Sequence, residues 1–203
     1  EKRLWRRAEL YEKLAKHAKT WNIEFSENDS QKLLDLILEK LEEFPRGKGL
    51  SQYINDISKH LGCNRICDLL SIAVTNDEFI LDDSKSVIRQ WATNCTQKIP
   101  PNSLFKIITS IDDDFLQAKI LGYFYLQCTK KEIDFHKALQ TALNCTKQLN
   151  QNDKIVNLRY LTRILQNEND FLLLGKEIQS LKDISDQVAL FSTLAGRADK
   201  RDL

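Results

Sequence analysis

The residue types best suited to chemistry in this chain gather in one short segment. It contains His60, Cys63 and Cys67, with Asp56 one helical turn before the histidine. Cysteine and histidine are common zinc ligands, and short spacings allow one segment to supply several of them. The spacing H-x2-C-x3-C has no second pair downstream, and Gly62 favours a helix end inside the group. We therefore predict no metal or other cofactor, and keep His60, Cys63 and Cys67 as the candidate metal ligands.

The same three residues are the candidates for a thiol enzyme. A cysteine nucleophile reacts as the thiolate and needs a cationic neighbour such as histidine. The chain has three histidines, and none lies in a recognisable nucleophile motif. We predict that the chain is not an enzyme, and an enzyme built on His60, Cys63 and Cys67 is the second alternative.

Cysteine usage bears on the cellular compartment. The chain has five cysteines, an odd number, and several of them fall on predicted apolar helix faces. Such cysteines are typical of buried free thiols in a reducing compartment. We therefore predict reduced cysteines and a cytoplasmic location.

Charge and hydropathy exclude some classes of protein. The 30 basic and 29 acidic residues leave a net charge of +1, so no global field attracts nucleic acid or an anionic membrane. No apolar run is long enough to cross a bilayer, and we predict no transmembrane segment.

The elements that must position these residues are predicted to be helices. Six glycines and three prolines are few for 203 residues and favour long regular elements. In residues 100–128, two apolar runs at helical spacing are separated by three aspartates, one of which is placed to cap the second helix. The first run is Leu104, Ile107, Ile108 and Ile111, and the second is Leu116, Ile120, Leu121, Phe124 and Cys128. This pattern predicts two helices folded against each other.

Weaker copies of the second run recur at intervals of 33 to 37 residues. The matching positions are Val87, Ile88, Trp91 and Cys95 before it, and Leu158, Leu161, Leu165, Phe191, Leu194 and Ala198 after it. Such a period is typical of helix pairs stacked in a row. We predict an all-α fold of stacked antiparallel helical hairpins, a short α-solenoid-like array with degenerate repeats. The alternative is an irregular helical domain whose helices have similar lengths.

The domain organisation follows from the turns. A Pro- and Gly-containing turn at 45–49 separates a predicted N-terminal helical pair, residues 1–46, from a hairpin region, residues 50–203. We expect both to form one continuous domain.

Asp134 is predicted to cap the helix that follows it. The sequence contains no methionine, which we interpret as a sign of a fragment from a longer protein.

The predicted function is a non-catalytic protein–protein interaction module, a scaffold or adaptor that binds a protein or peptide partner. The aromatic run at 123–125 covers more than one helix face, and exposed aromatic side chains are common binding anchors. The candidate partner-binding residues are Tyr123, Tyr125, Arg89 and Arg159. The sequence leaves open that this helix is instead buried on two sides.

The first alternative is a nucleic-acid-binding helical module. Residues 1–20 form a predicted amphipathic helix with a basic face, which gives local positive charge. The near-neutral net charge argues against nucleic acid as the partner but does not exclude it. The oligomeric state has no signature in the sequence.

Overall fold

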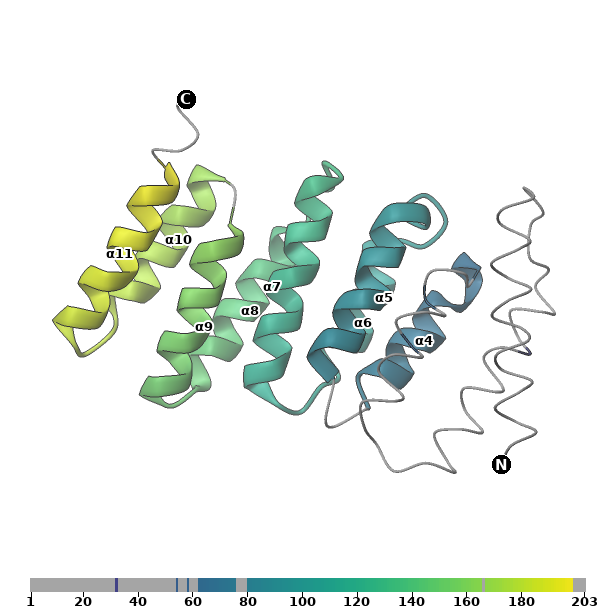
Figure 1. Ribbon diagram of the computed structural model, residues 1–203, viewed down its shortest axis with the longest axis horizontal. Coiled ribbons are helices and arrows are strands. Elements are labelled where there is room, and N and C mark those ends of the chain that lie inside the picture. Colours follow the sequence, from purple (N-terminus) through teal and green to yellow (C-terminus); the bar gives the residue numbers. More distant parts are fainter. Residues whose placement is uncertain are drawn as a thin grey trace. The chain divides into compact units, whose positions relative to one another are not determined.

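A computed structural model describes residues 62–75, 80–165 and 167–198, together with Lys32, Ile54 and Ser58. Within these residues every regular element is a helix, which confirms the all-α prediction (Figure 1). Apart from Lys32, the predicted N-terminal pair at 1–46 lies outside the described residues. The chain divides into two compact units, Glu1–Ile107 and Ile108–Leu203.

The described helices of the first unit pack around α4 and α5. Apolar residues at helical spacing on α4 face inward, and α4 contacts α5. On α5, the indole of Trp91 is fully buried, and its Nε1–H donates to the carbonyl oxygen of Ile99 at 2.9 Å. The elements are η1 (Cys63–Arg65), α4 (Ile66–Ala73), α5 (Ile80–Asn94) and α6 (Pro101–Ile108).

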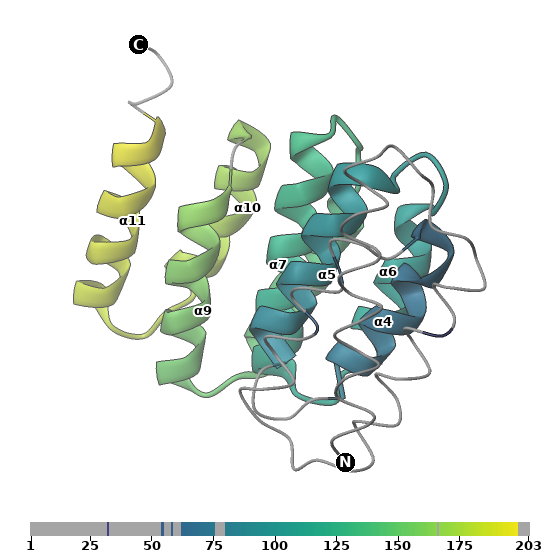
Figure 2. The same cartoon turned by 45° about the vertical axis from the view of Figure 1, so that its right-hand side comes forward.

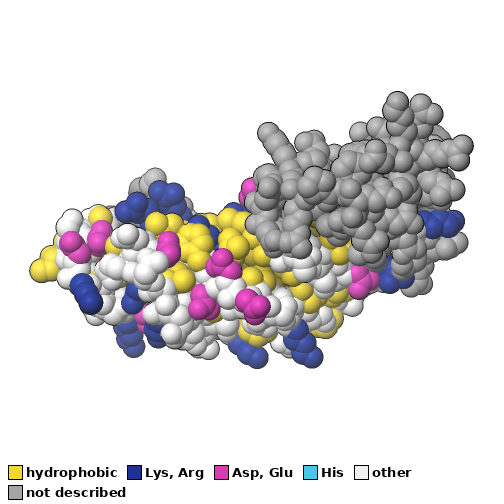
Figure 3. All heavy atoms as spheres, turned by 90° about the horizontal axis from the view of Figure 1, so that it is seen from below, with side chains coloured by type: hydrophobic (Ala, Val, Ile, Leu, Met, Phe, Trp, Pro, Cys, Tyr) yellow, Lys and Arg dark blue, Asp and Glu magenta, His cyan; other side chains and the backbone are white. Residues whose placement is uncertain are grey.

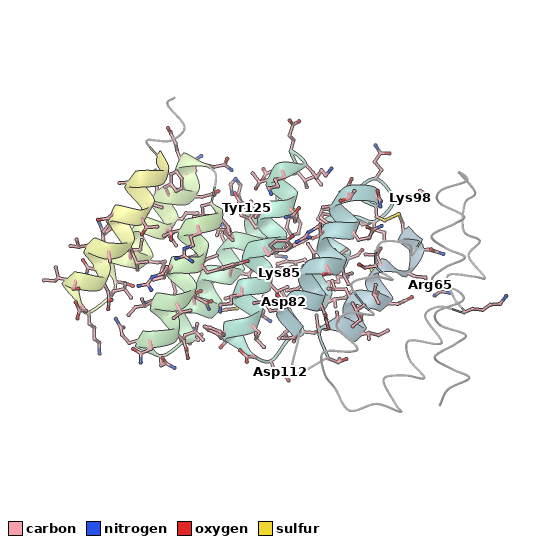
Figure 4. The ribbon with its side chains drawn as sticks, in the orientation of Figure 1. Arg65, Asp82, Lys85, Lys98, Asp112 and Tyr125 are labelled. Atoms are coloured by element: carbon pink, nitrogen blue, oxygen red, sulfur yellow. A yellow bond between two sulfur atoms is a disulfide. The ribbon has the colours of Figure 1, made fainter. Side chains whose placement is uncertain are left out.

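A disulfide in this unit corrects the prediction of reduced cysteines. Cys63 and Cys95 are joined, with their Cα atoms 5.3 Å apart and a separation of 32 positions in sequence. Figure 4 shows this bond in yellow beside the loop that carries Lys98. The sequence did not reveal the pair because the contact between η1 and the end of α5 has no local pattern. The argument for a reducing compartment therefore does not hold for these two cysteines, and the cytoplasmic location stays a prediction.

The second unit is built on α7. This helix contacts α8 and α9, and α9 in turn contacts α8, α10 and α11. In both views of the ribbon, α9 lies between α7 and α11 (Figures 1 and 2). The elements are α7 (Asp114–Lys130), α8 (His136–Gln148), α9 (Gln151–Ile164), α10 (Glu168–Gln179) and α11 (Ile184–Ala198).

Polar side chains fix the start of helix α7. As predicted, an aspartate caps it: the Asp113 carboxylate accepts hydrogen bonds from the amides of Phe115 and Leu116 at 2.8 and 3.0 Å. Buried Gln117 donates to the carbonyl oxygen of Ile111 at 2.8 Å. Its amide oxygen accepts from the thiol of Cys145 on α8 at 2.7 Å. These bonds satisfy polar groups that would otherwise be costly to bury.

Gly122 allows α7 and α9 to approach closely. A Cβ atom at this buried position would lie 2.6 Å from Leu161 Cδ2 and 3.0 Å from Ile164 Cδ1. Leu161 is itself buried, so its side chain has little room to move aside. The absence of a side chain at Gly122 is therefore part of the packing.

We expect Gly122→Leu to lower the free energy of unfolding by about 1–3 kcal/mol, because the new side chain overpacks the α7–α9 contact. Gly196→Leu is the control, since a Cβ atom at Gly196 meets no atom within 4 Å. Urea denaturation measures both. Equal stability of the two variants would contradict the close packing.

Candidate functional site

The structure separates the residues predicted to bind metal. Cys63 is bonded to Cys95, so its sulfur is not a free ligand here. Cys67 is half-buried on α4, and His60 lies outside the described residues. In the described ranges, no group of three or more His, Cys, Asp or Glu side chains is arranged to hold a metal ion.

The remaining thiols are not activated. Burial raises the pKa of Cys128 to about 12 and, with the nearby Asp114 carboxylate, that of Cys145 to about 11. Burial and Asp68 also raise the pKa of Cys67. A raised pKa keeps a thiol protonated at neutral pH and makes it a poor nucleophile.

The candidate partner-binding residues lie in different places. Arg89 is exposed on α5 of the first unit, while Arg159 on α9 and half-buried Tyr123 on α7 belong to the second. Tyr125 is buried, with 3 % of its surface exposed. This burial agrees with the alternative that α7 is covered on two sides, and the partner-binding role of Tyr125 stays a prediction.

Tyr125 instead forms part of a pocket of about 290 Å³ in the second unit. The pocket opens to solvent beside the α7–α8 turn, and we call it the turn pocket. Figure 4 shows Asp112 and Tyr125 toward opposite ends of α7, with Tyr125 at the end nearer the pocket. The lining residues are Tyr125, Thr129, Glu132, Ile133, Asp134, Phe135, His136 and Asn167.

Behind the pocket wall lies a buried carboxylate, that of Asp170. This residue sits in the first turn of α10 and has no exposed surface. The hydroxyl of Tyr125 donates to Asp170 Oδ2 at 2.6 Å and accepts from the Asn167 side-chain amide at 3.3 Å. A buried charge is stable only when it is paired or hydrogen-bonded. The positive end of the α10 dipole gives additional support.

The other oxygen of this carboxylate, Asp170 Oδ1, has no hydrogen-bond donor. It lies 3.4 Å from Nδ1 of His136, which is within ion-pair distance but lacks the geometry of a hydrogen bond. His136 Nε2 lies 3.7 Å from Asp134 Oδ1 on the other side. The imidazole therefore stands between a buried carboxylate and an exposed one.

Burial also perturbs the phenol of Tyr125. Desolvation raises its pKa from 10.0 to about 12, and the adjacent Asp170 carboxylate acts in the same direction. The phenol is therefore a firm hydrogen-bond donor at neutral pH and not a base.

The rim of the turn pocket contains a residue in an unusual conformation. Glu132 has a φ of 57°, the left-handed region that favours glycine. Its amide donates to Thr129 at 3.0 Å and that of Ile133 donates to Cys128 at 3.0 Å, the pattern of a Schellman cap. A non-glycine residue here costs on the order of 1 kcal/mol. The backbone is therefore strained at Glu132, a position that carries a carboxylate.

Sequence reasoning assigned Asp134 a different role and overlooked other residues of the pocket. The residue that caps α8 is Phe135, without a side-chain cap bond, so the predicted cap at Asp134 is wrong. His136, Asn167 and Asp170 were not singled out. A usable signal existed for Asp170, which shares the spacing of Leu174 and Ile178 on the buried face of α10.

Comparison with known protein families, curated proteins and solved structures gave no match. Among the described helices, none has both the length and the apolar character needed to cross a membrane. The function is therefore argued from the site itself.

We expect Tyr125→Phe to lower the free energy of unfolding by about 1.5–3 kcal/mol, because it removes a hydrogen bond to a buried charge. The exposed phenol of an unfolded chain ionises near pH 10, whereas the folded pKa is about 12. The stability linked to this shift is fully present below pH 10 and is lost as the pH rises toward 12. The variant should lack this part of the alkaline loss.

A double-mutant cycle with Asp170→Asn isolates the bond. Urea denaturation of the single and double variants should give a coupling energy of about 0.5–3 kcal/mol. Additive effects of the two substitutions would mean that the Tyr125–Asp170 bond does not stabilise the fold.

Proposed function

We propose that this chain is a non-catalytic interaction module that binds a protein or peptide partner through the turn pocket. In this proposal the helices form a short array of stacked hairpins. Two features support the array: α7, α9 and α11 contact one another in succession, and Leu158, Leu161 and Leu165 at the predicted repeat positions are buried. Stacked repeats place their loops on one face, which is often the binding face.

The observation that carries the proposal is the turn pocket itself. At about 290 Å³ it is at or below the range of about 300–1,000 Å³ typical of sites for small molecules and cofactors. It is large enough for one side chain of a partner. Its wall combines aromatic rings with fixed polar groups, a combination found in anchor pockets of protein interfaces.

The chemistry of the lining favours binding over catalysis. No cysteine, serine or lysine lines the pocket. The phenol of Tyr125 is held protonated, and His136 faces carboxylates on two sides. The other hydroxyl of the lining, that of Thr129, donates to the backbone carbonyl oxygen of Tyr125 at 3.1 Å, so its proton is engaged by the backbone.

The nucleic-acid alternative gains no support from the described residues. The side shown in Figure 3 carries Asp and Glu side chains interspersed with hydrophobic ones. Phosphate backbones bind to continuous positive surfaces. The basic helix predicted at 1–20 lies outside the described residues.

Selection from a display library of random peptides tests the proposal. Asp134 has an exposed side chain, so Asp134→Trp places an indole over the pocket without disturbing the core. Lys182→Trp is the control, because Lys182 is exposed and lies outside the lining.

We expect peptides that bind the native chain and Lys182→Trp equally, and Asp134→Trp at least about tenfold more weakly. Titration calorimetry of the selected peptides measures the affinities. Failure to select any peptide, or selection only of peptides that bind all three proteins alike, would refute the proposal.

A further inference from the structure

We infer that the turn pocket recognises the side chain of an arginine. The inference rests on the proposed function and names the chemical group that the pocket selects. It draws on the charge of the lining, on the buried carboxylate behind it and on the aromatic rings beside both.

The charged groups at the pocket are predominantly acidic. Glu132 and Asp134 contribute exposed carboxylates to the lining, which contains no Lys or Arg. Lys130, Lys131 and Lys137 are close in sequence but do not line the pocket. A positive group in the pocket would therefore meet two carboxylates and no fixed cation of the lining, apart from His136 when it is protonated.

A buried carboxylate lies behind this acidic rim, at Asp170. Asp170 Oδ1 is completely buried and accepts no hydrogen bond. Nδ1 of the His136 imidazole, which itself lines the pocket, lies 3.4 Å from this oxygen. A charge in a low-dielectric environment is poorly screened and acts over longer distances than an exposed one. Asp170 therefore adds negative potential to the pocket from behind its wall.

The aromatic rings favour arginine over lysine. The Tyr125 and His136 rings lie 5.7 Å apart, and Phe135, held edge-on by Phe124 at 5.6 Å, completes an aromatic wall. A guanidinium group stacks on aromatic faces and binds carboxylates with two parallel hydrogen bonds. An ammonium group is more strongly hydrated and lacks this planar shape.

The strained backbone at Glu132 fits the arginine-binding proposal. Glycine would fit the left-handed conformation better, yet glutamate is present and its carboxylate lies at the pocket. A residue that costs stability but supplies charge to a pocket is typical of a binding site. Replacing Glu132 by glycine should therefore change stability and binding in opposite directions.

The probes are three small amides: N-acetyl-arginine amide, N-acetyl-lysine amide and N-acetyl-citrulline amide, the neutral counterpart of the first. Each is titrated into the full chain and followed by two-dimensional amide NMR. The arginine probe should shift signals of residues 129–136 and the side-chain amide of Asn167. The lysine probe should bind more weakly, and the citrulline probe should cause no comparable shift. Added salt should weaken binding.

Three variants complete the test. Glu132→Gly and Asp134→Asn should each weaken binding of the arginine probe about two- to fivefold, the range expected for an exposed charge pair. Glu132→Gly should do so with an unchanged or higher melting temperature, because it relieves the left-handed strain. Glu168→Gln is the control, since Glu168 is exposed near the pocket in sequence but does not line it.

Equal binding of the arginine and citrulline probes would overturn the inference, as would an absence of binding at these residues. Neither result would refute the proposed function, because the display selection can still return pocket-dependent peptides without arginine. If the selection fails but the arginine probe binds, the arginine site is supported and the proposed peptide partner is refuted.

Discussion

The second unit depends on one constraint, the burial of the Asp170 carboxylate. A charge with no exposed surface needs donors at fixed positions, and Tyr125 supplies one from α7 at 2.6 Å. His136 approaches the other oxygen from the start of α8. The carboxylate therefore ties α7, α8 and α10 together at the end where the turn pocket opens. We propose that this buried negative charge also contributes to the preference of the pocket for an arginine side chain.

Helix α7 contributes to the packing of the second unit and to the wall of the turn pocket. Its start is fixed by the Asp113 cap, and its middle is packed closely on α9 at Gly122. Its last turns carry Tyr125 and end in the Schellman cap at Glu132, where the backbone is strained. Stable packing at the centre thus supports a less favourable conformation at the rim, where a carboxylate is useful. Such an exchange of local stability for function is common at binding sites.

The all-α class and the buried faces of the helices were predictable from local pattern, while the site was not. Apolar residues at helical spacing, such as Ile120, Leu121 and Phe124, are buried as the periodicity predicts, and an aspartate caps α7. The pairing of Tyr125 with Asp170 spans 45 residues and leaves no local signature. The Cys63–Cys95 disulfide was missed for the same reason. Periodicity shows which face of a helix is buried, but not which polar groups meet when two such faces pack.

The most direct test of the central claim is to observe the contact itself. In NMR with isotope-labelled N-acetyl-arginine amide bound to the unlabelled chain, filtered experiments report which protein protons lie near the arginine side chain. The account predicts nuclear Overhauser effects from the arginine δ-methylene protons to the rings of Phe135 and His136, which line the turn pocket. Effects confined to other surfaces of the chain at saturating probe would show that the acidic pocket does not hold the guanidinium group.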